Sequence, residues 1–216
     1  MSFEEKSREL QCLHTQLQFQ YGSLGDEFPE QVMSMMFLEG NEKVLELGGN
    51  IGRNSIIIGH ILNKNNNFDF VTLETNTEDA NKLKHNRDIN GLKFHVENCA
   101  LSNRKLIQTE WNSIPSDELL PGYFPVNTIT WKELNDKYNI VFDTLVLDCE
   151  GAFYYILQDM PEILDNIKLI IMENDYFADW SQFDFVIDRL INAGFRCVFN
   201  KDLPNIRPDF YQVWKR

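Results

Sequence analysis

A glycine-rich turn near residue 50 is the first segment whose residue types and spacing could do chemistry. It reads ELGGNIG over residues 46–52 and follows an apolar run, residues 43–47, that predicts a strand. Glycines in such a turn let the backbone approach a ligand closely, and the following helix would offer free N–H groups. The dinucleotide fingerprint G-x-G-x-x-G fails, because positions 50 and 53 hold Asn50 and Arg53. The turn therefore predicts a ligand site but disfavours nicotinamide chemistry.

Acidic residues end the apolar runs that follow this turn along the chain. Glu74 closes the run 69–74, 22 residues after Gly52, where a carboxylate can accept both hydroxyls of a ribose. Asp148 and Glu150 lie at the end of the run 144–148, and Glu173 ends the run 168–173. Because parallel strands present their carboxyl ends at one edge of a sheet, we expect these acids to share one crevice with the turn.

The elements that must position these residues are short apolar runs that alternate with amphipathic helices. This alternation predicts an α/β fold with a doubly wound, mostly parallel sheet and helices on both faces. The short link that contains Pro204 and Pro208 suits a hairpin, so the last strand is expected to be antiparallel. The expected core strands cover residues 43–47, 69–74, 93–96, 144–148, 168–173, 196–199 and 210–214.

The segments outside these strands are expected to be mainly helical. Ser2 and Glu5 form a capping box, and Pro29 suits the first turn of a second helix. We therefore expect a single domain in which residues 1–40 form a helical cap on a Rossmann-like core of residues 41–216. Further helices are expected over residues 76–90 and 131–138, from about 153, and over 183–192, and two strands at 106–109 and 126–129 flank a proline-containing loop.

The composition limits which partners the protein can bind and in which compartment it is expected. The formal net charge of −13 disfavours nucleic acids and anionic membranes as partners, because both are bound mainly through Lys and Arg. No apolar stretch approaches the roughly 20 residues that cross a bilayer, and the N-terminal residues do not resemble a signal peptide. The four cysteines lack metal-knuckle or redox-pair spacing. These features predict a cytoplasmic protein with a small-molecule or glycan partner.

Three motifs together resemble the FkbM family of S-adenosylmethionine-dependent methyltransferases. They are the Gly48–Gly52 turn, the segment DCEGA at residues 148–152 and Glu173 in IIMEN, and the resemblance covers about residues 40–175. The family implies the seven-stranded sheet order of class I methyltransferases, with the last strand antiparallel. It also implies methylation of a hydroxyl, often on a sugar, a glycan or another secondary metabolite. Thr75 and Trp131 depart from the family's pattern and leave the acceptor open.

The resemblance also implies roles for individual residues. Glu46 would accept from the methionine ammonium, Glu74 would hold the ribose, and the segment 98–101 would hold the adenine. The cofactor-binding set is Glu46, Gly48, Gly49, Asn50, Ile51, Gly52, Ser55, Glu74, Thr75, Cys99, Ala100 and Asp148, and the catalytic set is Asp148, Glu150 and Glu173. The segment at 148–151 lacks the Asn/Asp-Pro-Pro-Tyr pattern of amino-directed DNA and protein-glutamine methyltransferases.

Several alternatives stay open at this point. Either Asp148 or Glu150 could act as the general base, or a divalent metal could assist, with Asp148, Glu173, Asn174 and Asp175 as oxygen donors. Tyr21 and Phe28 could form an aromatic lid, and Tyr176, Phe177 and Trp180 could flank the ligand or form a small core. The function could also be methylation of another small molecule, or non-catalytic cofactor binding by a scaffold.

Overall fold

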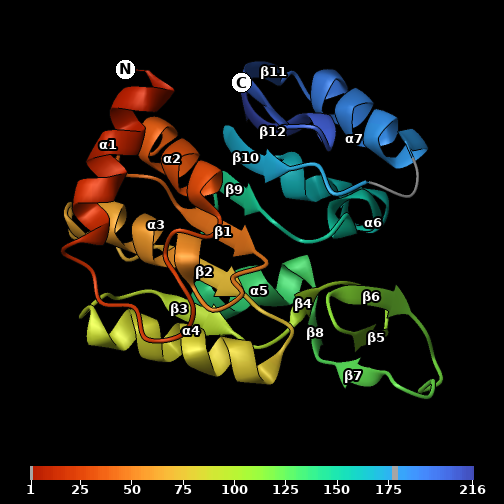
Figure 1. The fold of residues 1–216 in the computed structure, drawn as a ribbon. Coiled ribbons are helices and arrows are strands. Elements are labelled where there is room, and N and C mark those ends of the chain that lie inside the picture. Colours follow the sequence, from red (N-terminus) through yellow and green to blue (C-terminus); the bar gives the residue numbers. More distant parts are fainter. Residues whose placement is uncertain (1, 177–179) are drawn as a thin grey trace.

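Seven strands form the central sheet of the protein, for which a computed structural model describes residues 2–176 and 180–216. The strand order is β11-β12-β10-β9-β1-β2-β3. Neighbours from β10 to β3 pair in parallel, whereas β12 is antiparallel to both β10 and β11. This confirms the predicted mostly parallel sheet and its antiparallel last strand (Figure 1). The strands are β1 (Val44–Leu47), β2 (Phe70–Leu73), β3 (His95–Glu97), β9 (Thr144–Leu147), β10 (Leu169–Glu173), β11 (Arg196–Leu203) and β12 (Arg207–Lys215).

Helices cover both faces of this sheet because the core strands are apolar on both faces. In β1, Leu45 and Leu47 belong to a core with α5, α6 and α7, whereas Val44 belongs to a second core with α2, α3 and α4. Alternation therefore places Glu46 on the same face as Val44, beneath α3. The helices are α2 (Phe28–Phe37), α3 (Arg53–Asn63), α4 (Thr77–Ile89), α5 (Trp131–Tyr138), α6 (Ala152–Asp159) and α7 (Trp180–Asn192), with a 3₁₀ turn at Pro161–Leu164.

The N-terminal helix α1 (Phe3–His14) packs on α2, and α2 packs on α3 (Figure 1). Leu10 and Leu13 of α1 share a small core with Val32 of α2 and Ile57 of α3. The predicted capping box of Ser2 and Glu5 is present at the start of α1. Polar contacts also join the cap to the core: Ser34 donates to Asn54 at 2.9 Å in a buried contact. Within residues 2–176 and 180–216, no helix is long and apolar enough to cross a membrane.

Residues 100–129 form two small sheets beside the main one (Figure 1). The strands β4 (Ala100–Leu101) and β8 (Thr128–Ile129) pair in parallel, and a separate sheet has the order β6-β5-β7. The expected strand at 106–109 is β5 (Leu106–Thr109), whereas the expected strand at 126–129 is divided between β7 (Phe124–Val126) and β8. The loop expected between them contains an additional strand, β6 (Asn112–Pro115).

Candidate active site

A cavity of about 690 Å³ opens at the carboxyl ends of β1, β2, β9 and β10. The small sheets and the start of α2 complete its walls. A crevice at this edge is where doubly wound sheets bind ligands, and the volume suits a ligand of nucleoside size or larger. Of the residues predicted for the site, those that line the cavity are Gly48, Asn50, Glu74, Thr75, Cys99, Ala100, Asp148, Glu150 and Glu173.

The glycine-rich turn is fixed by the ends of its two neighbouring strands. The N–H groups of Gly48 and Gly49 both donate to the Leu73 carbonyl at 3.0 Å. Gly48 has φ +92°, and a Cβ there would lie 1.6 Å from the Asp148 carbonyl oxygen, so no other residue fits without moving the backbone. The turns after β1 and β9 are thus in direct contact.

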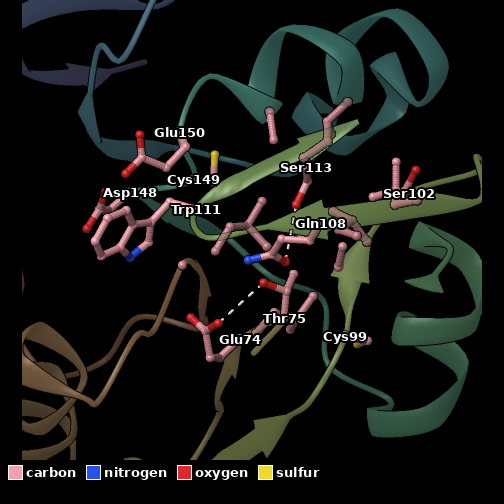
Figure 2. Close-up of a pocket in the computed structure, with 18 of the residues that line it drawn as sticks. Glu74, Thr75, Cys99, Ser102, Gln108, Trp111, Ser113, Asp148, Cys149 and Glu150 are labelled. Carbon is pink, nitrogen blue, oxygen red and sulfur yellow. Dashed lines mark hydrogen bonds between the residues drawn. The ribbon is translucent and has the colours of Figure 1, made fainter. Parts of the chain in front are cut away.

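Glu74 is held at the end of β2 by backbone groups. Its Oε2 accepts from the Asn50 N–H at 2.8 Å, and its Oε1 accepts from the Asn76 N–H at 2.7 Å. Burial raises the pKa of Glu74 above its ordinary value. Each carboxylate oxygen can accept more than one hydrogen bond, so the group can still receive hydroxyls from a ligand (Figure 2).

Glu46, the predicted partner of the methionine ammonium, is buried behind the cavity wall in this structure. Its side chain is only 2% exposed, is absent from the cavity wall and accepts a hydrogen bond from the Ser55 hydroxyl. Burial raises the pKa of Glu46 to about 7. The physical reason is strand alternation, which turns Glu46 toward α3. Gly49, Ile51, Gly52 and Ser55 also lie behind the cavity wall rather than in it.

The three predicted catalytic acids do meet in the cavity. Asp148 and Glu173 are half-buried and Glu150 is exposed. Figure 2 shows Asp148 and Glu150 on the same side of the cavity. Burial raises the pKa of all three above the ordinary range, and neighbouring carboxylates add to this effect at Asp148, where Glu27 contributes, and at Glu173. Such a site disfavours further negative charge and favours a cationic ligand.

Three of the four residues predicted as donors to a divalent metal lie close together in the structure. Asp148, Glu173 and Asp175 each place one carboxylate oxygen within 4.8 Å of the others. The fourth predicted donor, Asn174, donates from its amide nitrogen to the Asp209 carbonyl at 2.7 Å, and its buried Oδ1 accepts no hydrogen bond from the described residues. Burial raises the pKa of Asp175 to about 7.

Two acids of the cavity come from the N-terminal cap and were not predicted. Glu27 precedes α2 and accepts from Arg53 at 2.8 Å, and burial raises its pKa to about 7. Glu30, in the first turn of α2, is 7% exposed and lines the same cavity. A helix of acidic and apolar residues gives no sign in the sequence of which strand end it will face, so the fold was needed to find them.

The β5–β6 hairpin supplies another wall of the cavity, in addition to α6, and was also missed. It contributes Gln108, Trp111 and Ser113, and the Ser113 hydroxyl donates to Gln108 Oε1 at 3.3 Å. Trp111 is 69% exposed although it lines the cavity. Figure 2 shows its indole pointing toward the side on which Asp148 and Glu150 lie. An exposed indole face over a polar pocket is a suitable surface for a ring-shaped ligand.

The aromatic residues predicted as a lid lie elsewhere. Tyr21 packs on His85 and Phe28 packs on His14, and neither lines the cavity. Tyr176 is 3% exposed and belongs to the core shared with α6 and α7, whereas Trp180 packs on Phe183. Phe177, the third member of that predicted cluster, lies outside the described residues.

Comparison with known proteins supports the fold but names no family. No protein-family model matches the chain, and no curated protein matches it. The resemblance to the FkbM family therefore stays a prediction.

Solved structures with a similar fold include several methyltransferases. A proposed O-methyltransferase from Klebsiella pneumoniae has a TM-score of 0.56 at 12% identity, over 99% of this chain and 87% of that one. An O-methyltransferase from Bacillus cereus, in complex with S-adenosylhomocysteine, has a TM-score of 0.53 at 13% identity, over 98% and 91%. A proposed tRNA (m1A22) methyltransferase from Streptococcus pneumoniae has a TM-score of 0.51 at 15% identity, over 85% and 67%. The chain shares their Rossmann-like fold.

Proposed function

We propose that the protein is an S-adenosylmethionine-dependent O-methyltransferase that acts on a hydroxyl group of a sugar or glycan. The observation that supports this most directly is a single cavity with two chemically different ends. The first end, after β1 and β2, holds the glycine-rich turn and Glu74; the second, after β9 and on the β5–β6 hairpin, holds Asp148, Glu150 and Trp111, and the two meet where Gly48 abuts Asp148. The fold shared with class I methyltransferases agrees with this assignment.

The first end fits a nucleoside that carries positive charge. Glu74 offers two carboxylate oxygens at the end of β2, and Thr75, Cys99 and Ala100 continue the wall beside it. S-adenosylmethionine supplies an electrophilic methyl group on a positively charged sulfur and also carries an ammonium group. The buried carboxylates of the cavity favour such a cation over a neutral or anionic nucleotide.

The second end can accept a proton from a hydroxyl. Methyl transfer is an in-line displacement, so the acceptor oxygen must be positioned and must lose its proton as the new C–O bond forms. Asp148 and Glu150 line this end of the cavity, and both follow shortly after strand β9 in the sequence. The surrounding protein raises the pKa of both carboxyl groups, although Glu150 keeps part of its surface exposed. Each is therefore a stronger base than a fully solvated acid, which suits proton transfer near neutral pH. We assign the general base to this pair.

The chemistry of the hairpin wall supports a neutral, hydroxyl-rich acceptor. Trp111 presents an exposed indole, and Gln108 and Ser113 present groups that can donate and accept hydrogen bonds. The acids around them would repel a phosphate or carboxylate. A sugar ring satisfies each of these features because it stacks on an aromatic face and offers several hydroxyls.

Binding and transfer should be measured separately. Titration calorimetry with S-adenosylhomocysteine is expected to show one site per chain with micromolar affinity. Transfer of a radiolabelled methyl group to a panel of free sugars and oligosaccharides is then expected to give alkali-stable methyl ethers. Binding with transfer only to non-sugar molecules would correct the acceptor, and binding without any transfer would favour a scaffold. Absence of binding would refute the proposed function.

A further inference from the structure

The carboxylates at the ends of β9 and β10 lie closer together than their charges alone would allow. Asp148, Glu173 and Asp175 come from two neighbouring strands, and one oxygen from each lies within 4.8 Å of the other two. Like charges at this separation repel strongly inside a protein, so a proton or a cation must lie among them. The ion pairs formed among residues 2–176 and 180–216 involve none of these three acids.

A fourth carboxylate, from the N-terminal cap, points to what lies among them. Glu30 on α2 is 7% exposed, lines the same cavity and contacts the Glu173 carboxyl group. Its Oε2 is buried, and no hydrogen-bond donor from the described part of the chain reaches it. A buried carboxylate oxygen without a partner is costly, which indicates that the site is built for a ligand that accepts its lone pair.

The nearby basic side chains offset only part of the negative charge of these acids. Arg53 pairs with Glu27 and Asp26, and Arg207 lies 4.4 Å over the ring of Trp180. The charge of Arg207 lowers the pKa of Asp175, yet burial outweighs it and the pKa remains raised. The protein therefore supplies too little positive charge of its own for four acids.

We propose that Glu30, Asp148, Glu173 and Asp175 bind one hard divalent cation of the Mg²⁺, Mn²⁺ or Ca²⁺ class. All four donors are carboxylate oxygens, the ligand type that these ions prefer, and the set contains no thiolate or imidazole that would favour zinc or copper. Glu30 comes from the cap and the other three from the sheet, so the ion would join α2 to β9 and β10.

The position of this site gives the ion a role in the reaction, a consequence that rests on the proposed function. Asp148 and Glu173 both line the cavity, so a bound cation would lie where the acceptor hydroxyl is expected. A cation there would lower the pKa of that hydroxyl and orient its oxygen, and with Asp148 held as a ligand the proton would pass to Glu150. The ion binding itself does not depend on the methyl donor and can be tested without it.

The test is titration of the full chain with MnCl₂ after treatment with EDTA, followed by calorimetry and by the loss of the free Mn²⁺ signal in electron paramagnetic resonance. We expect one Mn²⁺ per chain with a dissociation constant below about 1 mM, and competition by Mg²⁺ or Ca²⁺. Saturating Mn²⁺ should also raise the Tm, since it binds only the folded chain. Absence of saturable binding at several millimolar would overturn the proposal and would mean that protons hold the cluster together.

Single substitutions locate the ion. Glu30→Gln and Asp175→Asn should each weaken Mn²⁺ binding at least about 10-fold, because each removes one charged ligand and keeps the size of the side chain. Glu110→Gln is the matched control, since it removes a carboxylate of the same cavity on the β5–β6 hairpin, and should leave Mn²⁺ affinity unchanged. Wild-type affinity in both cluster variants would refute this ligand set. If either variant fails to fold, the stoichiometry of the wild-type chain still decides the proposal.

The two proposals can fail independently. Binding of S-adenosylhomocysteine without Mn²⁺ binding would leave the methyltransferase proposal standing and refute the cation site. Mn²⁺ binding without S-adenosylhomocysteine binding would support the cation site and refute the methyltransferase proposal.

Discussion

The Asn50 N–H donates to Glu74 Oε2 at 2.8 Å, and this contact joins the glycine-rich turn to the end of the adjacent strand. Asn50 has φ +46°, a left-handed conformation that Asn tolerates better than most residues. The conformation directs its N–H toward the carboxylate. Glu74 therefore does two things at once: it fixes the turn and presents carboxylate oxygens to the cavity.

Glu74→Ala should weaken binding of S-adenosylhomocysteine at least about 10-fold, because a hydrogen-bonded charged group contributes about 1.5–3 kcal/mol. Calorimetry measures the change, and circular dichroism checks that the fold persists. Glu78→Ala is the control, since this exposed residue lies one turn into α4 and outside the cavity. Unchanged affinity in Glu74→Ala would refute the proposed cofactor orientation.

Asp148→Asn should lower kcat at least about 100-fold while the affinity for S-adenosylhomocysteine changes little, because a general base contributes about 10²–10⁴-fold. The amide keeps the shape of the side chain but cannot take a proton. Single-turnover methyl transfer across pH 6–9 gives the rate. Asp165→Asn, an exposed residue outside the cavity, serves as the control. Activity equal to that of the wild type would show that Asp148 is not the base.

Trp111→Ala should raise the KM for the acceptor about 10-fold without changing the affinity for S-adenosylhomocysteine, since stacking of an aromatic face contributes about 0.5–1.5 kcal/mol beyond its buried area. Its 69% exposure means that the substitution should not destabilise the fold. Steady-state kinetics with the sugar found in the screen measures the effect, and Trp111→Phe should restore most of it. Weaker binding of S-adenosylhomocysteine instead would show that Trp111 contacts the cofactor and not the acceptor.

Glu46→Gln should stabilise the protein at pH 8 by about 1–3 kcal/mol and have little effect near pH 4.5. Burial raises the pKa of Glu46 from 4.5 to about 7, so the folded state favours the protonated acid. The stability that this group contributes is full below pH 4.5 and is lost as the pH rises through about 7. Gln can still accept from Ser55, and the Thr72 hydroxyl lies opposite it in register.

Urea unfolding at both pH values measures this difference. Glu78→Gln is the control, and because its side chain is 80% exposed it should change the free energy of unfolding by less than about 0.5 kcal/mol at either pH. Destabilisation of Glu46→Gln at pH 8 would show that the ionised carboxylate is needed.

The sequence was sufficient to predict the sheet, because apolar runs with fixed spacing leave few ways to pack. Alternation along β1 also places Val44 and Glu46 on one face, whereas the motif argument considered only the distance of Glu46 from the glycines. The register of the strand therefore explains why Glu46 is buried beneath α3 in this structure, and its contact with the cofactor stays a prediction.

Other features could not be found from local patterns. β6 was expected to be a loop because it is polar and ends in Pro115, yet proline is tolerated on an edge strand, and β6 is at the edge of its sheet. The helix α2 was expected, but the presence of Glu27 and Glu30 in the cavity depends on how the cap docks on the sheet. Strand and helix ends also moved by a few residues: α7 begins at Trp180 rather than 183, and β11 and β12 are longer than expected.

The docking of α2 has a consequence for how this protein can be dissected. Residues 41–216 include every strand and resemble a minimal unit, but Glu27 and Glu30 would be missing from its cavity wall. The Arg53 guanidinium would lose its carboxylate partners Asp26 and Glu27, and Asn54 would lose its bond from Ser34. If residues 41–216 alone were inactive, the cause would be a cavity open to water on the side that α2 normally covers. Point substitutions in the full chain are the appropriate way to separate the contributions of the cap and the core.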